Sequence, residues 1–343
     1  MPNSIDSSGQ EPLLQAKNLK KYFKIRRKGM LHAVDDVSFK VYPGETLGLV
    51  GESGCGKSTI GNVVMRLHPK TSGSLLYRGK DVFTEWTDKL LLCRKMQIIF
   101  QDPYSSLDPR NTIYNTLSEA YIVHKHGSMD MVKKAVQDVC NLVEFPHSFL
   151  NRYPHELDGG MRQVVGIARA LSLNADFIVC DEPVSSLDVS VQARIINLMM
   201  DLQEKMNLSY LFISHDLSVV RHISKRIAVM YLGQIVETAD TDTIFTNAMH
   251  PYTIALLSAV PQIDRSSNLS RIILKGDVPS PLNPKPGCRF APRCWMAQKD
   301  CFDTNQDLIE VEPGHFVSCI KTAESMGRAK VAEKEILNSY TNE

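Results

Sequence analysis

The chain has 343 residues, of which 43% are hydrophobic and 22% are charged. This balance is typical of a folded protein with one large domain or two, so global disorder is excluded. The 39 basic and 38 acidic residues give a formal net charge of +1. That charge gives no reason to expect nucleic acid as a partner.

The sequence carries no obvious membrane or export signal. It has no run of about 18 apolar residues, the length that crosses a membrane as a helix. The polar start, MPNSIDSSGQEP, lacks the apolar stretch of a secretory signal. We therefore expect a cytoplasmic protein whose residues 1–12 form a disordered tail.

The first predicted elements are β-strands that lead into a glycine-rich loop. Alternating apolar residues over 14–45, interrupted by the basic stretch 24–29, predict strands joined by a loop. A short apolar strand over 46–50 runs straight into the glycine-rich loop. Residues 57–67 follow as a predicted helix.

Strands and helices then alternate. Residues 96–100 predict a short strand, and the pattern stays helical to about residue 171, with apolar side chains at helical spacing over 131–145. The apolar runs 177–180 and 210–214 are typical of strands buried on both faces. An amphipathic helix between them is marked by Ile195, Leu198, Met199, Leu202 and Met206. This alternation predicts a parallel α/β core.

The pattern changes after a predicted hairpin over 226–237, which turns near Gly233. Beyond about Pro261 prolines become frequent, and this argues against long helices. We expect a separate small domain over 261–343. Within it, the charged stretch Glu324–Leu337 is predicted to be a helix.

The glycine-rich loop matches the pattern G-x-x-x-x-G-K-[ST]. It comprises Gly51, Glu52, Ser53, Gly54, Cys55, Gly56, Lys57, Ser58 and Thr59. The glycines let consecutive backbone N–H groups surround phosphate oxygens, and the positive end of the next helix points at the same anion. We expect Lys57 to bridge the β- and γ-phosphates and the Ser58 hydroxyl to bind Mg²⁺. A chance glycine-rich turn is the alternative, but the flanking strand and helix supply the context that the motif requires.

A phosphate loop needs a second, acidic element. The apolar run 177–180 ends in Asp181 and Glu182. Asp181, at the carboxyl end of its strand, is expected to hold Mg²⁺ directly or through water. Glu182 is expected to act as general base on the attacking water. A buried strand with a polar end is the alternative, and the phosphate loop favours the catalytic interpretation.

From about residue 14 to 261 the sequence resembles the ATP-binding-cassette (ABC) ATPases. The motifs that carry this resemblance, besides the two above, are Phe23 with Tyr22 beside it, Gln101 after Phe100, the LDGGMRQ stretch Leu157–Gln163, the SSLD stretch Ser185–Asp188, and His215 after an apolar strand. The resemblance implies an α/β P-loop NTPase cassette with a RecA-like core, an antiparallel β subdomain and a helical subdomain.

The resemblance also implies boundaries, ligands and roles. The cassette would span residues 13–260, with the helical subdomain at about 102–171, and would bind ATP and Mg²⁺. Phe23 would stack on adenine. Gln101 would bind Mg²⁺ and link the nucleotide to the helical subdomain. His215 would sense and stabilise the γ-phosphate.

The family signature acts on the ATP of a partner subunit, because two cassettes close head-to-tail. Here it comprises Asp158, Gly159, Gly160 and Met161, while Asp188 would communicate across the dimer. The usual pattern is L-S-G-G-Q, so Asp158 replaces a serine. A hydroxyl donates to the γ-phosphate, whereas a carboxylate repels it. We therefore expect a weakened partner site, unless Asp158 is tolerated as a helix cap.

Several stretches look like the ATPase subunits of oligopeptide and dipeptide importers, closer to the second of the paired subunits. They include LGLVGESGCGKST, FQDPYSSLDPR, HPYTIALLSAVP and KGDVPSPLNP. This implies a second ATPase subunit, two membrane permease subunits, an extracytoplasmic binding protein and a place on the cytoplasmic face of the membrane. Import of nickel or metal chelates is the alternative, because that branch is shared.

Four cysteines gather in the proline-rich segment: Cys288, Cys294, Cys301 and Cys319. Four thiolates can complete a tetrahedral metal site or a cubane cluster. The resemblance implies a [4Fe-4S] cluster, with zinc, and free thiols or disulfides, as alternatives. His315 is a possible substitute ligand but is expected at the surface.

Two other classes stay open at this point. One is a soluble ABC ATPase that acts on ribosomes or DNA, although such proteins usually carry two cassettes or a long coiled-coil insert. The other is an iron–sulfur sensor that uses ATP binding as a switch.

Overall fold

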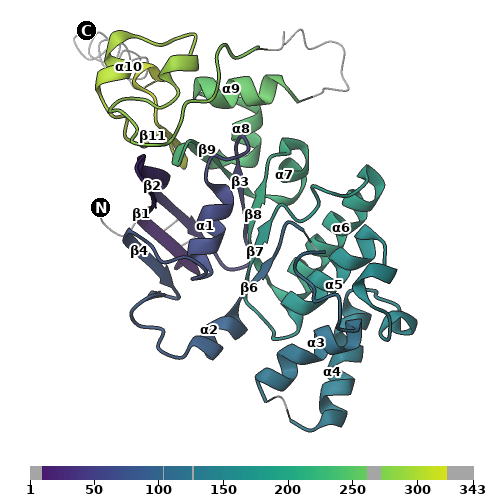
Figure 1. The fold of residues 1–343 in the computed structure, drawn as a ribbon. Helices are drawn as coiled ribbons and strands as arrows, with labels where there is room; N and C mark the ends of the chain where they lie inside the picture. The colour runs from purple at the N-terminus through teal and green to yellow at the C-terminus, as the bar shows by residue number, and fades with distance from the viewer. Residues whose placement is uncertain (1–9, 103, 126, 261–271, 323–343) are drawn as a thin grey trace, which may run out of the picture.

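The computed structural model describes residues 10–102, 104–125, 127–260 and 272–322 (Figure 1). Most of the expected N-terminal tail and the predicted helix Glu324–Leu337 lie outside these residues.

Eight strands of the described chain form the central sheet, in the order β11-β12-β10-β9-β3-β8-β7-β6. From β9 to β6 the neighbouring strands are parallel. These strands are β9 (Arg226–Tyr231), β3 (Thr46–Val50), β8 (Ser209–Ser214), β7 (Phe177–Asp181) and β6 (Met96–Ile99). The predicted parallel α/β core is confirmed.

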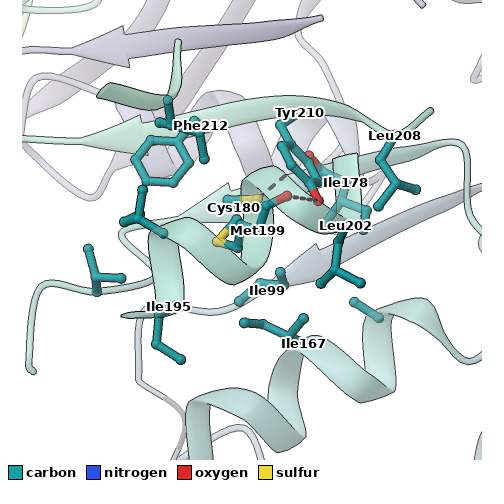
Figure 2. Close-up of a cluster of buried hydrophobic side chains, with 14 of the residues drawn as sticks. Ile99, Ile167, Ile178, Cys180, Ile195, Met199, Leu202, Leu208, Tyr210 and Phe212 are labelled. Atoms are coloured by element: carbon teal, nitrogen blue, oxygen red, sulfur yellow. Dashed lines mark hydrogen bonds between the residues drawn. The ribbon is translucent and has the colours of Figure 1, made fainter. Parts of the chain in front are cut away.

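The central strands are buried on both faces, as their apolar runs predict. Every residue of β3, β7 and β8 is buried. On β8, Tyr210 packs into one core and Leu211 into the other. Figure 2 shows the first core, where the Tyr210 hydroxyl donates a 3.1 Å hydrogen bond to the Met199 carbonyl. Continuous apolar sequence is therefore required on these strands.

Helices α5 (Gly159–Leu171) and α6 (Val189–Met206) contribute apolar side chains to the first core (Figure 2). The second core lies between the other sheet face, α1 (Lys57–Val64) and a four-stranded antiparallel sheet. The strands of that sheet lie in the order β2 (Gly29–Val41), β1 (Leu14–Ile25), β4 (Ser72–Tyr77) and β5 (Lys80–Asp81). Both the predicted strands over 14–45 and the helix after the glycine-rich loop are confirmed, although the helix ends at Val64.

In chain order, a helical region separates β6 from β7, and it lies to one side of the sheet (Figure 1). The predicted helix over 131–145 is observed as α4. Each of the α-helices α3, α4 and α5 starts after a residue whose side chain accepts a backbone N–H of the first turn, which fixes its start. The helices in this part are α3 (Ile113–Val123), α4 (Met129–Leu142), the 3₁₀ turns His147–Phe149 and Pro154–Glu156, and α5; α2 (Lys89–Lys95) precedes β6.

The predicted hairpin is β9 followed by β10 (Gln234–Asp240). Gly233 in its turn has φ +87°, which glycine adopts without strain. The helices around it are α7 (Leu217–Ile223), α8 (Thr241–Thr246) and α9 (Pro251–Ser258).

The cysteine-containing segment continues the central sheet, so the expectation of a separate small domain is not confirmed. β12 (His315–Val317) pairs with β10, and β11 (Ile309–Glu312) pairs with β12. Helices in this segment are short, as the prolines predict: a 3₁₀ turn, Ala291–Arg293, and α10 (Lys299–Asp303).

The expectation that His315 lies at the surface is wrong. Its side chain is 2% exposed, and its Nε2 atom lies 2.8 Å from Glu237 Oε1 on β10. The Glu237 carboxylate also accepts from the backbone N–H groups of Met249 and His250. The sequence near His315 does not show this burial, because its partner Glu237 lies 78 positions earlier in the chain.

Candidate functional site

The phosphate loop joins β3 to α1, as the motif requires. Gly56, directly before the helix, has φ +109°, and a Cβ there would lie 2.1 Å from the Ala33 carbonyl oxygen. Only glycine fits this position. As the N-cap of α1 it has no side chain that could cap the helix, so the first N–H groups stay available to an anion.

Lys57 is buried and bonded within its own loop. Its Nζ donates to the carbonyl oxygens of Gly51, at 2.8 Å, and Glu52, at 3.1 Å. These carbonyl contacts hold the ammonium group within the phosphate loop.

The two predicted Mg²⁺ residues from the loop and the acidic strand meet. The Ser58 hydroxyl donates to Asp181 Oδ1 at 2.8 Å. Burial raises the pKa of Asp181, and the neighbouring Glu182 charge raises it further, while the Ser58 bond and Lys57 oppose them. A divalent cation at this point would stabilise the ionised carboxylate.

Glu182 follows β7 in a left-handed conformation, with φ +47°. Such backbone strain in a non-glycine residue is common where a catalytic side chain must be aimed. Gln101 Nε2 donates to Glu182 Oε2 at 2.9 Å, and His215 Nδ1 lies 3.2 Å from the same oxygen. The predicted base, glutamine and histidine are therefore brought together.

These groups share one cavity of about 480 Å³. Its lining comprises Gly51, Glu52, Ser53, Gln101, Glu182, His215, Leu217 and Leu256. The carboxyl ends of parallel strands meet the phosphate loop here, which is where this type of sheet binds ligands. The cavity combines an anion-binding loop with a carboxylate placed to activate water.

The predicted adenine residue does not line this cavity. The Phe23 ring packs edge-on against His68, and Lys21 Nζ lies 4.7 Å from its centroid. Tyr22, beside it, stacks on His32 and donates to Asp35.

The signature loop also lies away from this cavity. Asp158 is exposed and caps α5, because its Oδ1 accepts the Met161 N–H at 2.8 Å. Gly160 packs so closely that a Cβ would lie 2.7 Å from Val191 on α6. Asp188, at the start of α6, is exposed as well. The helix cap that the sequence suggested for Asp158 is present.

The four clustered cysteines line one small cavity of about 20 Å³, together with residues that include His250 and Phe290. Backbone N–H groups point at three of the sulfurs: Met296 N lies 3.4 Å from Cys294 Sγ, Gln298 N lies 3.5 Å from Cys301 Sγ, and Phe290 and Ala291 donate to Cys288.

The size and the donor groups of this cavity can be compared with what the predicted cluster requires. Four thiols with amide donors are the chemistry of a thiolate-bound metal. Yet the described residues contain no group of three or more His, Cys, Asp or Glu arranged to hold a metal ion. A volume of 20 Å³ has room for about one water molecule. Burial raises the pKa of Cys288 to about 11, so its thiol is protonated at neutral pH. The donor set suits a metal, but its arrangement in this structure does not hold one.

Sequence reasoning missed two residues that contact the phosphate loop. Arg293 forms an ion pair with Glu52, and the Tyr252 hydroxyl accepts the Glu52 N–H at 2.9 Å. Both follow the phosphate loop by about 200 positions or more, so no local pattern signals the contact.

Comparison with known proteins accounts for these motifs. A family model described as "ABC transporter" matches residues 34–185, and one described as "Oligopeptide/dipeptide transporter, C-terminal region" matches residues 236–301. The oligopeptide transport ATP-binding protein AppF of Bacillus subtilis is 47% identical over 92% of this chain and 99% of its own length. The chain belongs to the ABC transporter ATP-binding proteins of the oligopeptide/dipeptide branch.

Other relatives agree with this assignment. The dipeptide transport ATP-binding protein DppF of Haemophilus influenzae is 45% identical over 90% of this chain and 96% of its own length. A solved dimeric ATP-binding cassette in a post-hydrolysis state, bound to ADP and phosphate, is 26% identical, covers 66% of this chain and 98% of that one, and gives a TM-score of 0.61. The structure of cbiO1 from Clostridium perfringens covers 69% of this chain and 92% of that one with a TM-score of 0.62, and supports the fold.

As a member of this family, the subunit is an ATPase. ATP and Mg²⁺ are expected ligands for a member of this family, and the cavity described above is the candidate site for them. Among the described residues, no helix is both long and apolar enough to span a membrane.

Proposed function

We propose that this chain is the ATP-hydrolysing subunit that energises import of oligopeptides or dipeptides across the cytoplasmic membrane. One observation carries the proposal: Glu182, Gln101 and His215 meet at a single oxygen beside the phosphate loop. Relatives named for peptide transport match over nine-tenths of the chain. They favour peptide over nickel or metal chelates as cargo.

We assign roles to these residues from the family resemblance, and the placement of several of them supports the assignment. Gly51–Thr59 hold the triphosphate, and Lys57 exchanges its carbonyl partners for phosphate oxygens. Ser58, Gln101 and Asp181 would hold Mg²⁺, and the ion would supply positive charge beside the phosphates. Glu182 takes a proton from the attacking water. The role of Phe23 in stacking on adenine rests on the family resemblance alone, because its ring does not line the cavity.

A partner subunit completes the site. The signature residues Asp158, Gly159, Gly160 and Met161 are away from this chain's own cavity, so they are free to act on ATP held by a second, related ATPase subunit. We propose a heterodimer in which Asp188 communicates across the interface. Closure of the two cassettes precedes hydrolysis.

Membrane partners dock on the helical subdomain at about residues 102–171. Large apolar side chains are exposed at the end of α3 and the start of α4: Ile122, Val123, Met129 and Met131. Exposed apolar groups of this kind mark interaction surfaces. Gln101 directly precedes this subdomain and contacts Glu182, so it links cavity and docking surface. In the proposed complex the subunit lies at the cytoplasmic face of the membrane, below two permease subunits that receive peptide from an extracytoplasmic binding protein.

The test uses the complete complex in proteoliposomes with luminal peptide and binding protein. Replacement of Glu182 by Gln should abolish turnover by removing the base, yet retain Mg·ATP binding. The matched control is Glu204→Gln at an exposed position on α6, which should behave as wild type. Turnover that survives in the Glu182→Gln complex, or peptide that never stimulates the wild-type ATPase, would contradict the proposal.

For the cysteine cavity we propose a [4Fe-4S] cluster held by Cys288, Cys294, Cys301 and Cys319, with zinc as the alternative metal. The amide donors to three sulfurs support it. Anaerobic purification, visible absorption, and iron, sulfide and zinc assays test it. Cys288→Ser should lose the metal, whereas Cys93→Ser, at an exposed cysteine elsewhere, should keep it. If every preparation yielded metal-free protein, the proposed cluster would be contradicted and the four cysteines would be free thiols.

A further inference from the structure

Glu52, the second residue of the phosphate loop, is held from outside the loop at two points. Arg293 forms a forked ion pair with its carboxylate: Nη1 lies 2.8 Å from Oε2 and Nη2 lies 3.2 Å from Oε1. The Tyr252 hydroxyl accepts its backbone N–H at 2.9 Å. Such two-point arginine–carboxylate pairs fix geometry as well as charge.

Both contacts come from the region that follows the core cassette motifs. Tyr252 lies on α9, and Arg293 ends the 3₁₀ turn between two of the clustered cysteines. The Arg293 side chain is 9% exposed, and its Nη1 lies 3.4 Å from the Tyr231 hydroxyl on β9. Tyr231 packs against Tyr252 with ring centroids 4.6 Å apart. The arginine is therefore part of a packed aromatic support.

The charge of Glu52 explains why this support matters. Glu52 lines the same cavity as Glu182, so an unpaired carboxylate on this residue would repel a bound triphosphate. Glu52 also supplies a carbonyl to Lys57 Nζ. Arg293 neutralises the Glu52 carboxylate. Together with Tyr252 it fixes the position of Glu52, whose carbonyl oxygen binds Lys57 Nζ.

We propose that Arg293 is a positioning residue for ATP binding, acting through Glu52 with the help of Tyr252. The segment that carries the cysteines thereby becomes part of the support of the nucleotide site. This inference rests on the proposed ATP site, which the wild-type complex tests separately.

The experiment measures KM for Mg·ATP and kcat in the complete complex, and Kd for Mg·ATP by equilibrium binding. Arg293→Gln should raise KM and Kd about tenfold, because it leaves a carboxylate unpaired beside the phosphates, with kcat changed less than about twofold. Arg293→Lys should recover most of the affinity, since it restores the charge. The double variant Glu52→Gln/Arg293→Gln should return KM to within about threefold of wild type, because the unpaired charge is gone.

The matched control is Arg226→Gln. Arg226 makes a similar forked pair with Glu45, at 2.6 and 3.0 Å, without contacting the phosphate loop. It should lower the melting temperature and leave KM unchanged. Tyr252→Phe removes only a hydroxyl and should raise KM about threefold, which keeps the test decisive if Arg293→Gln does not fold.

Three results would overturn the inference: a wild-type KM in both Arg293→Gln and Tyr252→Phe, no recovery in the double variant, or an equal rise in KM for Arg226→Gln. A wild-type complex that bound no Mg·ATP would instead sink the proposed ATP site. The two failures are therefore distinguishable.

Discussion

Asp181 combines two demands that conflict in the nucleotide-free protein. It must be ionised to hold Mg²⁺, but burial and the neighbouring Glu182 raise its pKa. A raised pKa means that the folded protein prefers the protonated acid. The stability that this preference contributes is present at low pH and is lost as the pH rises through the raised pKa. At neutral pH the site therefore stores unfavourable electrostatic energy that a cation relieves.

Replacement of Asp181 by Asn should show both sides of this conflict. The neutral amide can keep the Ser58 bond and removes a desolvated charge, so the melting temperature at pH 7 without nucleotide should rise, on the order of 2 °C. Mg²⁺-dependent turnover should be lost. Differential scanning fluorimetry and an ATPase assay measure the two effects. A melting temperature below wild type would contradict the electrostatic account. Asp201→Asn, at an exposed position on α6, is the control.

Asp158 presents the same question at the signature. Its carboxylate caps α5, and serine or asparagine caps equally well without charge. If the charge repels the γ-phosphate of the partner's ATP, Asp158→Ser and Asp158→Asn should both increase the turnover of the complex, several-fold for a relief of about 1 kcal/mol. Asp158→Ala, which lacks a cap, separates the two roles by lowering stability. Unchanged turnover in Ser and Asn variants would show that the aspartate acts only as a cap.

At the scale of elements, β10, β12 and the start of α9 meet at a buried carboxylate. Glu237 is fully buried and accepts from His315 and from two backbone N–H groups. Replacement of Glu237 by Ala removes all of these acceptors and should cost about 3 kcal/mol of unfolding free energy in guanidinium titrations. Glu312→Ala changes a neighbouring, half-exposed carboxylate 4.0 Å from His315 and should cost less than about 1 kcal/mol. Equal losses would show that burial of Glu237 is not the cause.

His250 gives the same junction a pH dependence. Burial lowers its pKa to about 4, despite the opposing charge of Glu237. The unfolded chain binds a proton below about pH 6.5 and the folded chain does not, so stability present above that pH is lost as the pH falls toward 4. Between pH 7 and pH 5 the loss should be about 2 kcal/mol. His250→Asn, which can still cap α9, should flatten this part of the profile; an equally steep profile would point to other groups.

The elements that the sequence predicts well are those whose signal is local. The strands β3, β7 and β8 are continuous apolar runs, and α4 and α6 keep helical spacing, so their placement follows from period and burial. β12 has three residues, and it is a strand because β10 offers an edge more than 70 positions earlier in the chain. No local pattern encodes that pairing, and the same reason hides the burial of His315.

In the candidate site, too, the residues of local motifs could be predicted from the sequence, whereas contacts between distant segments could not. Motif spacing identifies Lys57, Ser58, Asp181 and Glu182. In the structure Ser58 bonds to Asp181, and Glu182 lines the cavity beside the phosphate loop. The contact of Arg293 with Glu52 depends on how a turn of the C-terminal segment packs on the loop. A proline-rich sequence gives no periodicity from which such packing can be inferred.

At the scale of the whole molecule, the cassette and the cysteine segment share one sheet. A chain ended at residue 260 would lose β11 and β12 and expose the edge of β10. Open edges of this kind pair with other chains. The shortened protein should therefore aggregate, whereas the full chain stays dispersed at the same concentration. Sedimentation velocity compares them, and a monodisperse, ATP-binding fragment of residues 1–260 would show that the cassette is independent.

The shared sheet also bears on chimaeras made from relatives of this branch. The match to the C-terminal family region begins at residue 236, which lies inside β10. A graft joined there would cut through a hydrogen-bonded hairpin and bring a foreign arginine against a native Glu52. Chimaeras of this branch should therefore function more often when one donor supplies both the phosphate loop and the segment that carries Arg293.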